Sequence, residues 1–470
     1  MWLYLIPLML GYGCGELGHY LLAVTSRPMA QDVGFGDKGC LAKNQSLEED
    51  YQKQCTSISN ESRCINASNS KTCSWDYTGQ GIEYQILAGP TYVVIFTVVG
   101  VIFGILGDRY NRVRMYAISV VFFSVMTLAT GFSHQYWQLL TLRFLFGAGE
   151  SACTPLASSL VADWFPARSR GRGMSIYNWG IYLGYGLAFA VGNYMTDADI
   201  LDSGWRSGYV VTGIAGFVMA VVIIIAIREP PRGTIEFQTS ISYKEGTNAE
   251  EKKKGKFREV AALTCKNATV PLLLIGACFR HSASFCWSYN AQLYFDDYYP
   301  GTEVGFFMSI TSIAGGTIGI VVGGLASDIL ARKYGVKTRL WVLVVSQALA
   351  APCAAGVLLV EPPECFISLL VAYLFAEMWF GVLFTILVEF YPAHARASAV
   401  ACFIFVINNI GGNAQLIVPP LADLMGFRES LYLVYPGFYL TSSIFFLFAQ
   451  LSLLVKTNTS KVDPCEVTKL

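Results

Sequence analysis

Charged residues are scarce in this chain, and neither sign is in excess. Asp, Glu, Lys and Arg make up 14% of the 470 residues, whereas soluble domains carry about 25%. Because 33 basic residues balance 33 acidic ones, there is no basic surplus to support nucleic-acid binding. Hydrophobic residues make up 54% of the chain, which also excludes a disordered protein. This apolar surplus indicates that the chain is solvated by lipid.

Recognisable catalytic motifs are also missing. The sequence has no Walker phosphate loop, no cluster with metal-ligand spacing and no nucleophile elbow. Its glycine-rich pieces lie inside apolar stretches, not between a strand and a helix. We therefore expect no enzyme activity, no metal and no cofactor. Any uphill transport must then be driven by an ion gradient, since there is no ATP site.

Long apolar stretches fill most of the sequence. Twelve of them approach the roughly 20 residues that a helix needs to cross a bilayer, without the period-2 alternation of barrel strands. We predict an all-α membrane protein with twelve transmembrane helices in two six-helix halves. An alternative for the first stretch is a signal peptide, although it lacks a basic n-region. The predicted spans are 2–24, 84–106, 115–132, 137–161, 173–195, 208–227, 269–295, 304–330, 340–360, 365–390, 397–420 and 431–455.

The distribution of basic residues orients these spans. One set of connecting segments holds 23 of the Lys and Arg residues, the opposite set holds 8, and 2 lie inside spans. By the positive-inside rule, both termini and the middle segment are cytosolic. The predicted organisation is a first half at 1–227 with an outer loop at 25–83, a cytosolic linker at 228–268, a second half at 269–455 and a tail at 456–470.

The outer loop is long, polar and rich in cysteine. It contains three N-glycosylation sequons, at Asn44, Asn60 and Asn66, on the side where glycosylation occurs. Four cysteines in an oxidising compartment indicate two disulfides with three possible pairings, the alternative being free thiols in a flexible loop. These cysteines are Cys40, Cys55, Cys64 and Cys73.

Two corresponding loops, one in each half, carry similar signals. The loop after the second span has Gly104, Asp108, Arg109 and Arg112, and the loop after the eighth has Asp328 and Arg332. Such a correspondence is what an internal repeat predicts, and the pattern resembles the signature loop of the major facilitator superfamily. The cations can pair with Asp163, after the fourth span, in one conformation and release it in another. These residues are our predicted gate; ordinary positive-inside charge is the alternative.

Within that superfamily, the chain most resembles the Spinster group of lysolipid and sphingolipid transporters. The resemblance is carried by 107–112, 143–151, 161–163 and 228–233, and more weakly by Glu377 and the sequence 392–396. Two features depart from the group. The first span has Glu16 and His19 where the group usually has an Asp-Arg pair, and the cysteine-rich outer loop resembles that of organic-ion transporters.

Few ionisable residues lie within the spans, and each costs about 2.5–3.5 kcal/mol on insertion scales, so each needs a partner or a cavity. The resemblance places all of them on the first, fourth, seventh and tenth helices, which line the central cavity of facilitators. Arg280 and His281 could alternatively extend to the headgroups. The predicted substrate-binding residues are Arg143, Glu150, Glu16, His19, Glu377 and Arg280.

The proposed chemistry of these residues is electrostatic. Arg143 stays charged and its planar guanidinium suits an anionic headgroup such as phosphate. Glu150 and Glu16 hold a proton more readily in a low dielectric, and His19 can share it. The alternative for Arg143 and Glu150 is a static pair that locks helices together.

Three functions therefore remain open. The first is proton-linked, alternating-access transport of an amphiphilic anion, a lysophospholipid or sphingoid phosphate. The second is transport of a small organic ion, and the third is a facilitator-fold sensor without a transport cycle. We expect a monomer in the plasma membrane or the lysosomal membrane. Its expected partners are a lipid or small amphiphilic substrate, protons and the lipid bilayer, with no nucleic acid.

Overall fold

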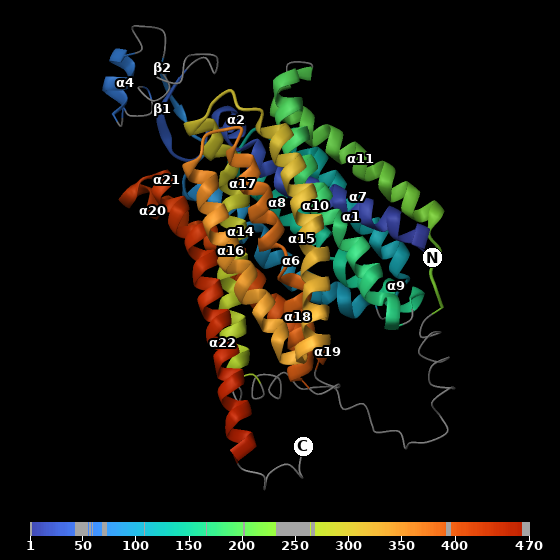
Figure 1. Cartoon of the computed structure of the whole chain (residues 1–470). Coiled ribbons are helices and arrows are strands. Elements are labelled where there is room, and N and C mark those ends of the chain that lie inside the picture. Colours follow the sequence, from blue (N-terminus) through green and yellow to red (C-terminus); the bar gives the residue numbers. More distant parts are fainter. Residues whose placement is uncertain are drawn as a thin grey trace. The chain divides into compact units, whose positions relative to one another are not determined.

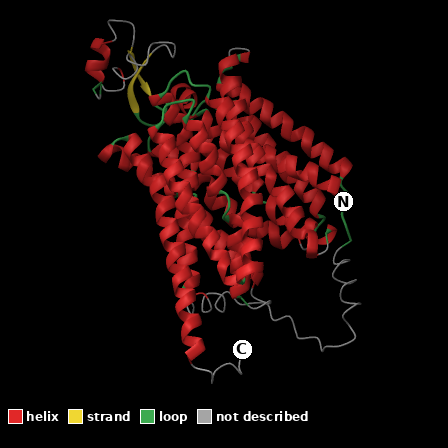
Figure 2. Ribbon diagram, in the orientation of Figure 1, coloured by secondary structure: helices red, strands yellow, loops and turns green. Residues whose placement is uncertain are grey.

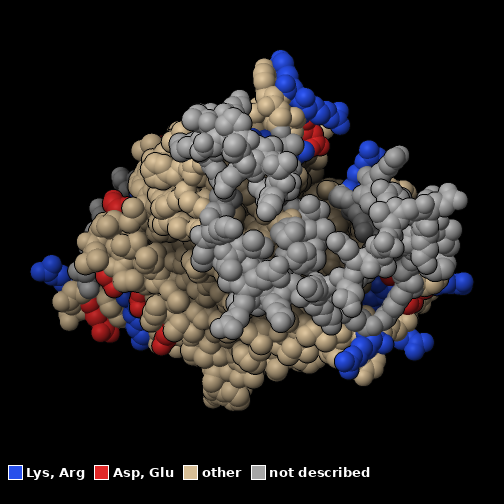
Figure 3. Space-filling model, turned by 90° about the horizontal axis from the view of Figure 1, so that it is seen from below, with Lys and Arg blue, Asp and Glu red and all other residues tan. Residues whose placement is uncertain are grey.

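The computed structural model describes residues 2–42, 55, 58, 60–67, 73–107, 109–165, 167–200, 203–231, 264, 268–391 and 396–462. This described chain is almost entirely helical (Figures 1 and 2). All twelve predicted spans are occupied by helices, which confirms the all-α membrane fold. Figure 3 shows one face of the protein. Among the residues it colours, uncharged residues (tan) outnumber Lys and Arg (blue), which lie mainly near the margin of this view.

The described residues of the first half form nine principal helices. They are α1 (Trp2–Val24), α2 (Ser26–Val33), α5 (Ile82–Ala88), α6 (Pro90–Gly107), α7 (Arg112–Thr130), α8 (Tyr136–Glu150), α9 (Cys153–Trp164), α10 (Ala167–Ala198) and α11 (Trp205–Ala226). Among them α1 packs on α10, and α7 packs on both α8 and α11.

The second half begins with two helices of about 30 residues. Its elements are α14 (Thr269–Tyr298), α15 (Val304–Tyr334), η3 (Val336–Thr338), α16 (Arg339–Leu359), α17 (Cys365–Ala376), α18 (Phe380–Phe390), α19 (Arg396–Gly411), η4 (Ala414–Ile417), α20 (Val418–Met425), α21 (Phe427–Val434) and α22 (Pro436–Val462). Here α16 packs on both α17 and α22.

Nine helical stretches of the described chain are long and apolar enough to cross a membrane by length and composition. The remaining predicted spans correspond to α1, to α8 with α9, and to α10. The first two of these carry the buried residues Glu16, Arg143 and Glu150.

The fourth and tenth spans are each split by a short turn. In the fourth, α8 ends at Glu150 and α9 begins at Cys153. Pro155 accounts for this break, since proline cannot donate a hydrogen bond to the carbonyl of Ser151 and clashes with it. In the tenth, Glu377 caps α17 and α18 begins three residues later. A carboxylate thus lies at a helix interruption in each half, fully buried at Glu150 and 13% exposed at Glu377, and such interruptions are typical of transporter binding sites.

The described residues pack as two compact units. Unit 1 comprises Met1–Ala249, Ser288–Ile313 and Gln415–Pro419, and unit 2 comprises the remainder. The last third of α14 and the start of α15 therefore pack with helices of the first half. This grouping arises because residues after Ser288 bond to α1, α5, α8 and α10. The division at 228–268 stays a prediction.

The outer end of unit 1, defined as the end that carries α2 and the outer loop, holds a small disulfide-braced lobe. Strands β1 (Lys38–Ala42) and β2 (Cys73–Tyr77) pair antiparallel beside α4 (Glu61–Ala67), near the top of Figure 1. Both predicted disulfides are present, as Cys40–Cys64 and Cys55–Cys73. Among the sequons, Asn60 is exposed, Asn66 lies in α4 and Asn44 lies outside the described residues.

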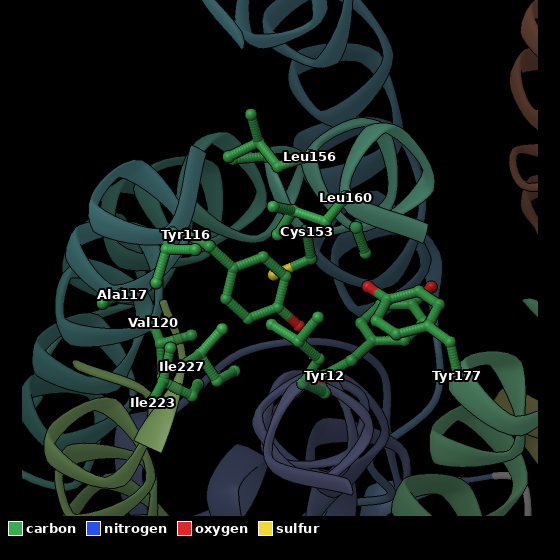
Figure 4. Close-up of a cluster of buried hydrophobic side chains, with 14 of the residues drawn as sticks. Tyr12, Tyr116, Ala117, Val120, Cys153, Leu156, Leu160, Tyr177, Ile223 and Ile227 are labelled. Carbon is green, nitrogen blue, oxygen red and sulfur yellow. Dashed lines mark hydrogen bonds between the residues drawn. The ribbon is translucent and has the colours of Figure 1, made fainter. Parts of the chain in front are cut away.

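The core of unit 1 forms where α1 meets α7, α9 and α10. Tyr12 stacks on Tyr177 with ring centroids 5.0 Å apart, and the Tyr116 hydroxyl donates to the carbonyl of Leu8 at 2.8 Å (Figure 4). The helices approach closely because α10 presents glycines to α1. A β-carbon at Gly184 would lie 2.5 Å from the carbonyl oxygen of Gly13. This backbone contact fixes the helix that carries Glu16 and His19.

Candidate functional site

Four buried ionisable residues form a cluster in unit 1. Glu16 and His19 lie on α1, and Arg143 and Glu150 lie on α8; their exposed fractions are 8%, 2%, 7% and 0%. Their spacing along each helix, three and seven residues, puts each pair on one helix face. The structure brings these four predicted site residues together, while their roles stay predictions.

The structure gives Arg143 a partner that the sequence does not reveal. Its Nη2 donates to the Tyr289 hydroxyl of α14 at 2.9 Å. The same hydroxyl lies 2.6 Å from Nε2 of His19. The guanidinium also lies over the Tyr92 ring, 4.9 Å from its centroid, a favourable cation–π geometry. Tyrosines from two helices thus enclose the buried cation.

The two carboxylates are held separately from this cation. The Tyr92 hydroxyl donates to Oε2 of Glu150 at 2.8 Å, and the Tyr12 hydroxyl hydrogen-bonds to Glu16. Glu150 also packs against the backbone at Gly15, where a β-carbon would lie 2.5 Å from its Oε1. Among the described residues, no ion pair within 4.0 Å joins Arg143 to either carboxylate. A static Arg143–Glu150 pair is therefore absent from this conformation.

Three buried atoms of the cluster have no hydrogen-bond partner in the described chain. They are Oε1 of Glu150, Nε of Arg143 and Nδ1 of His19. Buried polar atoms are nearly always satisfied, and exceptions often mark functional positions. This cluster therefore has capacity for a proton on the carboxyl and for an acceptor atom beside the guanidinium.

Unit 2 contains a second buried charge group around the interruption in the tenth span. Nη2 of Arg280 donates to Oε1 of Glu377 at 2.6 Å and to the carbonyl of Ala376 at 2.9 Å. The guanidinium lies 4.4 Å from the Trp379 ring centroid. Because Arg280 is only 3% exposed, it does not extend to the headgroups. His281 is half-buried, with its ring 4.7 Å from that of Phe285.

The predicted gate of the first half contains an ion-pair cluster. Nη1 of Arg112 lies 2.6 Å from Oδ2 of Asp163, and its Nε lies 2.8 Å from Oε1 of Glu229. Glu229 also accepts from the Val113 backbone at the start of α7, where a carboxylate is favoured by the helix dipole. The role of Glu229 is missed by our sequence analysis, although an acid directly after the sixth span was available as a signal.

The other predicted gating residues occupy simpler positions. Gly104 lies beside Pro155, Arg109 and Arg332 are exposed, and Asp108 lies outside the described residues. In the second half, Oδ1 of Asp328 pairs with Nη1 of Arg339 at 2.9 Å.

Contacts at the outer end of unit 1 join α14 to segments of the first half. We call three of them the outer lock: the ion pair Arg27–Asp297, the bond from Gln85 to Asn290 at 3.0 Å, and the bond from the Tyr84 hydroxyl to the carbonyl of Tyr289 at 2.6 Å. The partners are more than 200 residues apart, so no local pattern in the sequence identifies them.

A cavity of about 830 Å³ lies beside the outer lock. It is lined by α2, the β1–β2 pair, α10, and the ends of α14 and α15. Its ionisable lining residues are Arg27, Asp76, Asp197, Asp296, Asp297 and Glu303. None of these six ionisable residues is among the site residues predicted from the sequence.

Comparison with known proteins identifies the architecture. The model of the Major Facilitator Superfamily matches residues 8–414. Human "Protein spinster homolog 1" is 35% identical over 152 residues, and the zebrafish (Danio rerio) "Sphingosine-1-phosphate transporter SPNS2" is 31% identical over 152 residues. These alignments span 32% of this chain and 28% and 30% of the two relatives, so they cover less than a third of each relative's length.

Solved structures match over nearly the whole chain. A bacterial homologue of the human lysosomal transporter Spinster, in an inward-facing and unoccupied conformation, superposes with a TM-score of 0.68 at 18% identity. The match covers 97% of this chain and 96% of that one. The xylose transporter XylE from E. coli gives a TM-score of 0.63 at 15% identity, covering 94% and 95% of the two chains. At these identities the matches establish the fold alone.

Proposed function

Because this chain belongs to the major facilitator superfamily and is similar to Spinster proteins, it is a multi-pass membrane transporter rather than an enzyme, and we propose that it carries an amphiphilic anion. The proposed substrate class is a lysophospholipid or a sphingoid phosphate, moved by alternating access and driven by protons. The plasma membrane and the lysosomal membrane are the two proposed locations.

The observation that carries the substrate class is the state of Arg143. Among the described residues, this buried guanidinium contacts a tyrosine hydroxyl and two aromatic faces and has no carboxylate within 4.0 Å. A buried charge that is not directly paired is costly, so an anion that enters the site gains a strong partner. Phosphate suits the guanidinium because its oxygens match the planar fork of N–H donors.

Proton coupling follows from the charge balance of the same cluster. Arg143 contributes one positive charge, and Glu16 and Glu150 contribute up to two negative charges. The cluster is neutral when one carboxyl is protonated. An anionic headgroup on Arg143 adds at least one negative charge, and a proton on the second carboxyl offsets it. Substrate and proton should therefore bind together, because burial penalises any uncompensated charge.

Gating is proposed to use the cytosolic ion-pair cluster of the first half. Arg112 holds Asp163 and Glu229 at the ends of three different membrane segments. An ion pair of this kind opposes separation of the helix ends until the transport cycle breaks it. The second-half pair of Asp328 with Arg339 joins α15 to α16 in a comparable way.

A second candidate substrate class is a small organic ion. The cavity beside the outer lock favours it, since that cavity is lined by several ionisable and amide side chains, among them Asn193 and Gln292. A polar vestibule of this kind suits a compact polar solute better than an acyl chain. The two candidates make opposite predictions in a transport assay.

The test is uptake by the full-length protein in liposomes across an imposed pH gradient. Radiolabelled lysophospholipid, sphingosine 1-phosphate and a panel of small organic ions are compared, with Arg143→Ala and Glu150→Gln alongside. Arg206→Ala is a control, because Arg206 pairs with Asp32 at the outer surface. We expect uptake of lysolipid or sphingoid phosphate that depends on pH. This uptake should be lost in Arg143→Ala and in Glu150→Gln, and it should be kept in Arg206→Ala. Uptake of organic ions without lysolipid would support the second candidate and refute the first.

A further inference from the structure

We propose that segment 78–81, which we call the strap, lets the disulfide-braced outer lobe hold the outer lock closed. The strength of this hold sets how often the outer end opens. The inference rests on the alternating access of the proposed function, and it assigns a role to the lobe, which the transport chemistry does not use. The strap follows strand β2 directly and ends where α5 begins. It therefore connects the lobe to a helix that carries part of the lock.

The strap contacts both members of the ion pair in the outer lock. Nε of Arg27 donates to the carbonyl of Thr78 at 3.0 Å, and Nε2 of Gln80 donates to Oδ2 of Asp297 at 2.6 Å. The other carboxylate oxygen of Asp297 binds Arg27. The side chains of the pair are only 14% and 17% exposed, so water has limited access to either. Asp297 must therefore leave two protein partners at once when α14 moves away.

The backbone of the strap lies directly against Arg27. Gly79 has a φ of +79°, a conformation that favours glycine, and a β-carbon built there would lie 2.7 Å from Cα of Arg27. The strap thus fixes the backbone of Arg27 as well as its side chain. Because the guanidinium donors form a rigid fork, the bond from Nε to Thr78 also directs Nη2 toward Asp297.

The outer lobe holds the strap from its other side. The ladder between β1 and β2, whose strands are yellow in Figure 2, continues through Asp37. The Asp37 carbonyl accepts from the Thr78 backbone at 2.9 Å, and its N–H donates to the carbonyl of Gln80 at 3.1 Å. A disulfide holds each strand, through Cys40 in β1 and Cys73 in β2. The strap is therefore ordered before it meets the lock, and its bonds to the lock cost little further conformational entropy.

This order gives the lobe a direct effect on the closed state. When α14 moves, the strap stays with the lobe and with α2, so it does not follow Asp297. Opening then breaks both bonds to the carboxylate, and closing finds the strap already in position to receive it. A strap without the lobe would have to be ordered again at each closure. We therefore expect the intact lobe to keep the outer end closed for longer.

The test measures access to the outer end without any substrate. Ser288→Cys is the reporter, because Ser288 is only 8% exposed and precedes every lock residue of α14. Its rate of modification by a membrane-impermeant thiol reagent is measured in the full-length protein in liposomes, without reductant. Each rate is normalised to Glu303→Cys in the same variant, since Glu303 is exposed on the loop before α15. This corrects for the fraction of molecules whose outer end faces the medium, and the chain without an added cysteine gives the background.

The decisive comparison is between two glycines with nearly the same backbone conformation. Gly79→Ala places a methyl group against Arg27 and should raise the modification rate of the reporter about tenfold, because the strap must lift from the lock. Gly301→Ala is the matched control. Gly301 has a φ of +82° on the loop after α14, but no atom lies within 4 Å of a β-carbon built there. This control has the same backbone strain without the contact, so it should keep the native rate.

Two further variants separate the strap from the lobe. Gln80→Leu removes one hydrogen bond to a carboxylate and should also raise the rate about tenfold. Replacing both Cys55 and Cys73 by serine leaves every lock residue in place. This double variant should raise the rate as well, because the strap loses its anchor in the lobe. Folding of each variant is checked by size-exclusion chromatography, and Gln80→Leu decides the matter if Gly79→Ala does not fold.

Asp297→Asn opens the ion pair itself and separates the outcomes. If it reacts faster while the strap and lobe variants keep the native rate in folded protein, the inference is overturned and the proposed transport cycle is unaffected. If Asp297→Asn also keeps the native rate, the outer end does not open, which overturns alternating access together with this inference. An equal increase in Gly301→Ala and Gly79→Ala would assign the effect to backbone strain and would likewise overturn the inference.

Discussion

Replacing Gly184 by alanine should destabilise the protein, even though alanine is the better helix former. A β-carbon at this position of α10 would lie 2.5 Å from the Gly13 carbonyl oxygen and 2.6 Å from Cβ of Glu16. Comfortable carbon contacts begin near 3.5 Å. Both neighbours belong to α1, so the clash can be relieved only by moving the helix that carries the charge cluster.

The expected magnitude is the difference between two opposing terms. Forcing a methyl group into a packed helix contact costs about 1–3 kcal/mol. The higher helix propensity of alanine offsets up to about 1 kcal/mol of this. The net loss of stability should therefore be about 1–2 kcal/mol. Transport should fall as well, because displacement of Glu16 disturbs the site.

A matched control is available in α15. No atom lies within 4 Å of a β-carbon built at Gly324, so Gly324→Ala has only the propensity term, a gain of about 0.5–1 kcal/mol. Thermal unfolding of the two variants in the same detergent should shift Tm in opposite directions. Equal upward shifts would refute the close contact between α1 and α10 on which the site depends.

Three further predictions concern other parts of the molecule. Glu229→Gln should lower Tm in thermal unfolding, because the Arg112 side chain is only 3% exposed and would keep one carboxylate partner instead of two. An unchanged Tm would mean that Asp163 alone is a sufficient partner for Arg112. Arg280→Lys keeps a positive charge near Glu377 but loses the contact of the planar guanidinium with the Trp379 ring, so substrate uptake should fall about tenfold. Uptake at the wild-type rate would contradict a role for that contact. Replacing both cysteines of the Cys55–Cys73 bond by serine should lower the stability of the outer lobe by about 3 kcal/mol, and an added protease should then cleave the lobe faster. Equal cleavage rates would show that the Cys40–Cys64 bond alone keeps the lobe folded.

Local patterns in the sequence predict the helices and the buried charges well. A helix in lipid needs an apolar run of near 20 residues whatever it packs against, so α1, α7 and α16 begin and end close to the predicted positions. Spacing along one helix also relates Arg143 to Glu150. The two disulfides of the outer lobe follow from cysteine number and compartment, and the structure adds which cysteines pair.

Features that depend on distant segments are not visible in the sequence. Tyr289 is one of 26 tyrosines in the chain, and only the packing of α14 against α1 and α8 places it between His19 and Arg143. The pairing of Arg27 with Asp297 likewise joins segments 270 residues apart. The prediction of twelve continuous spans also misses the helix interruptions, of which the one in the fourth span has a local cause in Pro155.

The central claim is that substrate and proton move together through the cluster of Arg143, Glu150 and Glu16. Its most direct test is proton flux driven by a substrate gradient in liposomes that enclose a pH-sensitive dye, with no pH gradient imposed at the start. We predict that a gradient of lysophospholipid or sphingosine 1-phosphate changes the internal pH in wild-type liposomes, and that Glu150→Gln abolishes this change. Substrate movement without any change of internal pH would contradict the account.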